Sequence, residues 1–210
     1  MTFSQYVAMA GSHVDQRGAK VLNYDQEGWA AIIEFCRTRK WRWRRGSGNI
    51  MTVAGTSTYD MTSSASGMLD APDIEEIDNV YMVDGDGEIH KLDEITNEND
   101  IALALETTEQ DDPQKYFRTP GIDTSLTVSP VPDAADKLRV MYWRVPLFET
   151  AVPDPDAIPL VPGYLHPTLV KYLEVRLLHY SLGEEDESYN TAKAELEEMM
   201  QVAVANETGG

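Results

Sequence analysis

The chain has 210 residues, a length that allows one large domain or two small ones with a sizeable core that needs no disulfide or metal to hold it. Its charge is unusual, because 17 basic and 36 acidic side chains give a formal net charge of −19 and a pI near 4.4. Proteins that bind duplex DNA or anionic lipid need a basic surface, so this balance argues against both classes. A single cysteine, Cys36, excludes an intramolecular disulfide framework and a multi-cysteine zinc site.

The sequence shows neither a membrane span nor a secretory leader. No apolar run approaches the roughly 18 residues that a span requires. No basic leader followed by an apolar stretch precedes residue 20. We therefore expect a soluble, non-secreted protein without membrane contact.

The first regular element is expected after a weakly patterned start. Residues 1–22 have no clear apolar period and predict an N-terminal arm. Asn23 is a good helix N-cap, and Gln26 stands at the capping-box position. Apolar residues then recur from Trp29 to Cys36 at helical spacing, which predicts an amphipathic helix with Cys36 in the core rather than as a nucleophile.

From Ile50 to Pro146 the pattern changes to short runs separated by turn residues, which is typical of β structure. The acidic turn 84–87 between two apolar runs is the strongest hairpin signal in the chain. As a calcium loop it fails, because isoleucines stand where an EF-hand needs its glycine and its last glutamate. A short helix is expected within 93–105, followed by an acidic loop to Asp112. The predicted strands are Met51–Ala54, Tyr59–Met61, Ile77–Asp84, Glu88–Leu92, Lys115–Arg118, Ser125–Ser129 and Lys137–Val145.

Two helices are expected after a proline-rich stretch. The first runs from about Leu165 to Leu182, with Pro167 suited to its first turn and Gly183 suited to its C-cap. The second begins among the carboxylates at 184–187, which favour the positive end of a helix dipole. The two predict an antiparallel helix pair.

These elements predict an α+β fold. The first and last helices each have one apolar face, so the economical arrangement packs the N-terminal helix with the C-terminal antiparallel helix pair in a small helical bundle, with an antiparallel β domain inserted between them. The expected organisation is an N-terminal arm (1–22), a helical bundle (23–46 with 163–205), an inserted β domain (47–146), a proline-rich linker (147–162) and a flexible tail (206–210).

The motifs of catalysis are missing from the sequence. It contains no Gly-x-Ser-x-Gly elbow, no phosphate loop and no dinucleotide-binding glycine motif. His166 and His179 are thirteen residues apart on one predicted helix, so they lie on different faces. Since 36 carboxylates will form close pairs by chance, none stands out as an acid/base couple. We therefore expect no enzymatic activity, no cofactor and no metal site.

A basic cluster is the most unusual local feature. Six of the 17 basic residues fall within positions 37–45, where we expect the first helix to run into an Arg-Trp sequence and to end at 46–48. One interpretation is an exposed helix end with its tryptophans packed inward. Another is contact with an acidic surface on a neighbouring subunit or partner, and direct DNA contact is the third and least favoured. The expected contact residues are Arg37, Arg39, Lys40, Trp41, Arg42, Trp43, Arg44 and Arg45, with Glu184, Glu185, Glu187 and Glu195 as acidic counterparts.

An ordered series of motifs resembles a known family. After the first helix and its Arg-Trp sequence come Tyr59-Asp60-Met61, Leu-Thr-Val-Ser-Pro-Val-Pro-Asp at 126–133, Leu-Arg-Val-Met-Tyr-Trp-Arg-Val-Pro at 138–146, and the stretch from Ile158 to Tyr172. This series resembles the head-to-tail adaptor (connector) proteins of tailed bacteriophages, especially those of short-tailed phages. The resemblance spans about Asp25 to Met200.

The resemblance implies a structural virion protein at the head–tail interface, assembled in the host cytoplasm and without enzymatic activity. Such adaptors form a homo-oligomeric ring, usually of twelve copies, below the portal protein. The ring extends the DNA channel and docks the next tail component, which is a tail tube, nozzle or stopper protein. Genomic DNA would pass through the lumen without specific binding. Twelve copies of this chain would carry −228, and an acidic lumen does not retain DNA.

Two other functions stay open. A different tail component, such as a stopper or tail-completion protein, would share this composition but bind below another ring. An unrelated acidic interaction module would join no ring at all.

Overall fold

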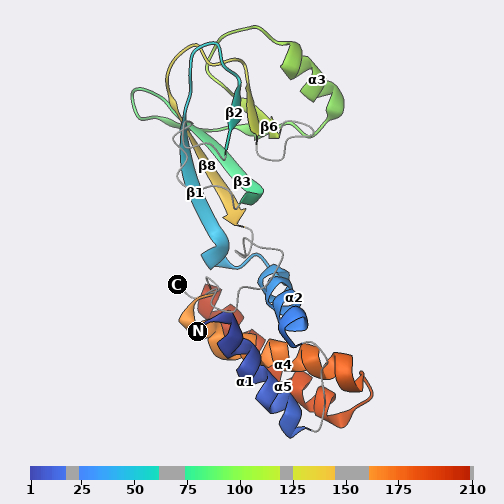
Figure 1. The fold of residues 1–210 in the computed structure, drawn as a ribbon. Helices are drawn as coiled ribbons and strands as arrows, with labels where there is room; N and C mark the ends of the chain where they lie inside the picture. Colours follow the sequence, from blue (N-terminus) through green and yellow to red (C-terminus); the bar gives the residue numbers. More distant parts are fainter. Residues whose placement is uncertain (18–23, 62–73, 119–124, 145–160, 209–210) are drawn as a thin grey trace. The chain divides into compact units, whose positions relative to one another are not determined.

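The computed structural model describes residues 1–17, 24–61, 74–118, 125–144 and 161–208. The chain divides into two compact units, a helical unit (Met1–Arg44 with Pro146–Gly210) and a β unit (Arg45–Val145), each drawn in Figure 1. The described residues contain five α-helices and two four-stranded sheets, which confirms the α+β class. Within those residues, no helix combines the length and apolarity needed to cross a bilayer.

Helix α4 is the centre of the helical unit. It packs against each of the other three helices of the unit, and its buried residues include Leu169, Leu173 and Leu177, all with no exposed surface. The helices are α1 (Phe3–Gln16), α2 (Tyr24–Arg37), α4 (His166–Leu182) and α5 (Glu187–Thr208), with short 3₁₀ turns η1 (Arg42–Arg44) and η3 (Gly163–Leu165).

The predicted N-terminal arm is wrong, because residues 3–16 form helix α1. Thr2 and Gln5 close a capping box at its start, and Phe3, Tyr6 and Val14 are buried in the core of the unit. The apolar stripe of α1 does have helical spacing, but alanine and glycine residues dilute it, so the pattern is faint in the sequence. Among the residues that the structure describes, the bundle therefore has four helices rather than the expected three.

The end of α2 also differs from expectation. The helix stops at Arg37 instead of continuing through the Arg-Trp sequence, because the carbonyl of Phe35 accepts hydrogen bonds from the Thr38 hydroxyl (2.8 Å) and from the Trp41 indole (3.1 Å). These bonds satisfy a last-turn carbonyl without another turn of helix. The proposed cap at Asn23 lies outside the described residues.

The predicted ends of α4 are confirmed. Pro167 lies in its first turn, and Gly183, with φ of +83°, donates its N–H to the carbonyl of His179 (3.0 Å). Helix α5 continues to Thr208, so residues 206–208 are helical and do not belong to the expected tail. Most of the expected linker, 147–160, lies outside the described residues.

The β unit consists of two sheets. Their orders are β1-β8-β3-β4 and β2-β7-β6-β5, and every pairing is antiparallel except β5–β6. Most of the buried apolar side chains of the β unit, from Ile50 to Tyr142, form one cluster. The strands are β1 (Arg45–Met51), β2 (Thr58–Asp60), β3 (Ile74–Val83), β4 (Ile89–Lys91), β5 (Asp93–Glu94), β6 (Lys115–Arg118), β7 (Ser125–Ser129) and β8 (Lys137–Arg144), and helix α3 (Glu98–Glu106) lies between β5 and β6.

Strand β1 occupies the glycine-rich segment 46–48, which was expected to end the first helix. The strand expected at Met51–Ala54 is wrong, because β1 ends at Met51 and residues 52–54 are not in a strand. Gly46 pairs with Tyr142 on β8, and a Cβ at this glycine would lie 2.7 Å from the tyrosine ring. Glycine is therefore needed here for close packing rather than for a helix stop. Strands β6 and β7 have the predicted bounds, and β3 and β4 form the predicted hairpin.

A buried carboxylate holds three helices of the helical unit together. Glu174 on α4 has no exposed surface and lies close to three basic groups: His13 Nδ1 at 3.1 Å, Arg17 Nε at 3.0 Å and Lys171 Nζ at 2.8 Å. Lys171 and Arg17 also reach Glu195 on α5, at 2.7 and 3.7 Å. Because a buried charge is costly unless it is paired, this network requires α1, α4 and α5 in one arrangement.

Glu174→Gln is expected to lower the free energy of unfolding of the helical unit by about 1–3 kcal/mol, since it removes the buried acceptor that three partly exposed basic groups share. Urea unfolding followed by far-UV circular dichroism measures this loss. Glu195→Gln is the matched control, because its carboxylate is exposed and its ion pairs contribute less than about 1 kcal/mol. Equal, small losses in the two variants would show that the network does not organise the bundle.

Candidate functional site

The predicted contact residues of the basic cluster divide into buried and exposed groups. Trp41 has no exposed surface and stacks on Phe35 with ring centroids 5.3 Å apart. Arg44 is 4% exposed and donates a hydrogen bond to the carbonyl of Cys36 (2.7 Å). Trp41 and Arg44 therefore fix the chain after α2 and are not available to a partner, whereas Cys36 is buried as predicted.

Three further members of the cluster are partly engaged within the chain. Arg45 belongs to the β unit and pairs with Asp78 at 2.6 Å. The Arg39 guanidinium lies over the Trp41 ring, 5.1 Å from its centroid, and Trp43 packs against the helical core. The sequence had placed all eight residues in one contact group, and the fold divides them.

The exposed remainder of the cluster is a short basic segment, which consists of Arg37, Lys40 and Arg42. It begins at the last residue of α2 and ends at the first residue of η1. The backbone N–H of Arg42 donates to the carboxylate of Glu207 near the end of α5 (2.7 Å), so this segment is anchored to the last turns of the bundle.

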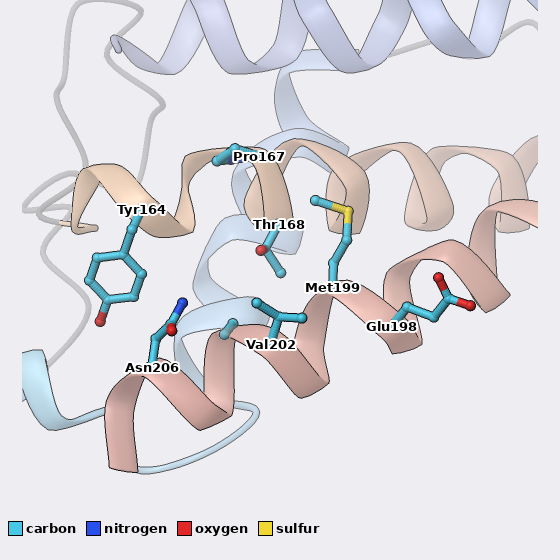
Figure 2. Close-up of a pocket in the computed structure, with 8 residues that line it drawn as sticks. Tyr164, Pro167, Thr168, Glu198, Met199, Val202 and Asn206 are labelled. Atoms are coloured by element: carbon cyan, nitrogen blue, oxygen red, sulfur yellow. The ribbon is translucent and has the colours of Figure 1, made fainter. Parts of the chain in front are cut away.

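An apolar groove lies beside that anchor on the helical unit, between η3, the first turn of α4 and the second half of α5 (Figure 2). Its volume is about 330 Å³, and Tyr164 (49% exposed) and Val202 (63% exposed) open to solvent in it. Large apolar side chains that remain exposed together mark interaction surfaces. The residues that line it are Tyr164, Pro167, Thr168, Glu198, Met199, Val202, Ala203 and Asn206.

Glu207 connects the groove to the basic segment. Its carboxylate is 9% exposed and accepts hydrogen bonds from the Tyr164 hydroxyl and from the Arg42 backbone. Desolvation, followed by the hydrogen bond and charge of Glu207, raises the pKa of Tyr164 to about 12, so the phenol stays a neutral donor. The groove and the basic segment therefore adjoin one another. We call the two together the docking face.

The acidic residues expected as counterparts lie elsewhere on the helical unit. Glu184, Glu185 and Glu187 are exposed around the α4–α5 turn, where Glu184 lies 3.5 Å from His179. Glu195 is engaged by Lys171, whose hydrogen bond and charge lower the pKa of this carboxyl. Contact between these carboxylates and the basic segment of a neighbouring subunit stays a prediction.

The β unit presents a different surface on helix α3. None of its residues is buried, and Leu103 and Leu105 are 65% and 54% exposed. The run from Ile101 to Leu105 is apolar on all sides, a composition that is ordinarily buried. Between Lys91 and Lys115 the sequence has eight carboxylates and no basic residue. Helix α3 is therefore an exposed apolar helix within an acidic stretch of the sequence. This combination suits a partner surface that carries basic residues.

The sequence prediction missed both apolar surfaces. The sequence signal for the groove was Val202, an apolar residue of α5 that is exposed in the fold. The signal for α3 was five consecutive apolar residues, a run that covers all sides of a helix.

Comparison with protein families gives one match over nearly the whole chain. A family model described as SU10 adaptor protein matches residues 1–209. The match includes α1, whereas the resemblance noted in the sequence began near Asp25. No curated protein matches the chain.

Trp41→Ala is expected to lower the free energy of unfolding of the helical unit by about 3–5 kcal/mol, because it leaves a cavity against Phe35. Lys40→Ala, one residue earlier and exposed, is expected to change it by no more than about 0.5 kcal/mol. Urea titration of both variants measures the difference. A stable Trp41→Ala variant would contradict the structural role assigned to this tryptophan.

Proposed function

Because the chain belongs to the SU10 adaptor protein family, a family of phage head-to-tail adaptors, we propose that twelve copies form a ring below the portal of a short-tailed phage, extend its DNA channel and dock its tail. A structural adaptor of this family is a virion component, and the family is not a class of enzymes. The match over residues 1–209 is the observation that carries the proposal. The two units carry different surfaces, and this difference supports a separate binding partner for each unit.

The helical unit binds the portal and the adjacent subunits through its docking face. The basic segment is exposed in a chain of net charge −19, so it is suited to an acidic surface on the portal or on a neighbouring copy. The adjoining groove accepts apolar side chains, which supply most of the binding energy in protein interfaces. In this arrangement the charge of the basic segment orients the contact, and burial of apolar surface in the groove stabilises it.

The β unit binds the next tail component, a nozzle, tail tube or stopper protein. Its exposed helix α3 combines apolar side chains with an acidic surround. This surface is opposite in charge to the basic segment of the helical unit. Two surfaces of opposite charge allow one chain to bind two different neighbours, because each surface disfavours the partner of the other.

Genomic DNA passes through the ring without being held. A ring of twelve chains carries −228, and phosphate is repelled by an acidic wall. A basic wall would instead release counterions from the DNA and bind it. The sign of the net charge therefore agrees with a channel rather than with a DNA-binding collar.

Negative-stain imaging of the purified chain with the portal protein of the same phage tests the proposal. A second ring appended to one end of the portal, with its symmetry, is the expected result. Unchanged portals, with recruitment of the chain only to a completed portal–adaptor assembly, would place it below another ring as a stopper or tail-completion protein. Binding to neither would indicate an unrelated acidic interaction module.

The double variant Lys40→Glu/Arg42→Glu is expected to weaken portal binding by at least about tenfold, since both changes place like charge against an acidic partner surface. Lys115→Glu/Arg139→Glu, the same reversal at two exposed positions of the β unit, is the control and is expected to leave portal binding within about twofold. Surface plasmon resonance at two salt concentrations measures both. Unchanged affinity of the first variant would exclude the basic segment from the portal contact.

A further inference from the structure

Three side chains with metal-binding groups converge at the tip of the β3–β4 hairpin. The Nε2 atom of His90 lies 3.7 Å from Asp84 Oδ2 and 3.6 Å from Glu88 Oε2. One ligand atom from each of the three residues lies within 4.8 Å of the other two. No function discussed above uses these residues.

We propose that Asp84, Glu88 and His90 bind a divalent transition-metal ion of the Zn²⁺ type. Zinc takes imidazole nitrogen at about 2.0–2.1 Å and carboxylate oxygen at about 2.0–2.2 Å, which places two tetrahedral ligand atoms about 3.4 Å apart. His90 Nε2 lies 3.7 and 3.6 Å from the two carboxylate oxygens, within a few tenths of an ångström of that spacing, and the two carboxylates approach one another to within 4.8 Å. A water molecule supplies the fourth ligand.

The turn itself orients the first of these ligands. Asp84 Oδ1 accepts hydrogen bonds from the backbone N–H groups of Asp86 (3.0 Å) and Glu88 (2.9 Å), which leaves Oδ2 facing the imidazole. Strand pairing fixes the other side, because His90 is registered opposite Met82 on β3. Hydrogen bonds of this kind, which orient a ligand from outside the coordination sphere, strengthen metal binding.

The surroundings favour a cation. Two of the three ligands, Asp84 and His90, line a hollow of about 380 Å³ together with Asp93 and Asp112. These two carboxylates stand beside Asp84, so negative charge is concentrated here. Lys91 also lines the hollow and offsets only part of that charge.

The histidine decides which class of cation the site prefers. The sequence argument against a calcium loop at this turn rested on counting ligand positions along the chain from Asp84, as an EF-hand requires. The fold instead returns His90 across the turn to face Asp84 and Glu88. Imidazole suits zinc and its neighbours, whereas calcium prefers oxygen ligands, so we expect Zn²⁺ and Co²⁺ to bind more tightly than Ca²⁺.

Isothermal titration of the full chain, freed of any affinity tag, with Zn²⁺ tests the site, and Co²⁺ absorption reports its geometry. One Zn²⁺ per chain is expected. His90→Ala is expected to weaken binding by at least about tenfold, the loss that even an orienting partner causes. Asp84→Asn is expected to weaken it as well, while its remaining oxygen still accepts the two turn hydrogen bonds.

His179→Ala is the matched control, because His179 Nε2 lies 3.5 Å from the single carboxylate of Glu184 and should not affect zinc binding. Absence of stoichiometric Zn²⁺ binding, retention of full affinity in His90→Ala, or an equal loss in His179→Ala would each overturn the assignment. Calcium binding as tight as zinc binding would overturn it too, because the acidic turn alone would then hold the cation. The assay needs neither portal nor ring, so its outcome is independent of the proposed adaptor function.

Discussion

The helical unit depends on the burial of one carboxylate. Glu174 lies at the centre of α4 with no exposed surface, and a charge in that position is tolerated only when cations surround it. Two of its three basic neighbours, His13 and Arg17, come from α1 and the residue that follows it. This requirement explains why the first residues of the chain form a packed helix instead of an arm. It also connects α5 to the network, because Lys171 contacts Glu195 on that helix.

Some basic side chains of this protein contact buried groups, and others lie exposed on the surface. Arg17, Lys171 and Arg44 are engaged with buried or half-buried groups, where they organise the fold. The basic segment that remains exposed adjoins an apolar groove, and both are anchored by the same carboxylate, Glu207. Because the chain is acidic overall, this cluster of exposed cations is suited to an acidic partner surface. The acidic, apolar helix α3 gives the β unit a complementary chemistry.

The features that could be predicted from the sequence alone are local turns, strands and helix ends. The hairpin at 84–87, strands β6 and β7, the start of α4 at Pro167 and its end at Gly183 all follow from residues a few positions apart. Turn chemistry and apolar period act over that range, so a single sequence reveals them. The α+β class and the burial of Cys36 followed from the same patterns.

The tertiary structure decided which charged and aromatic residues are internal. His13 lies 161 positions from Glu174, and Arg42 lies 165 positions from Glu207, so no periodicity joins them. The same reason separates Trp41 and Arg44, which are buried, from Lys40 and Arg42, which are exposed, although all four stand together in the sequence. A charged side chain either stabilises the fold from inside or remains on the surface, and the partner that the fold brings to it decides which. Only desolvation and pairing distinguish these two cases.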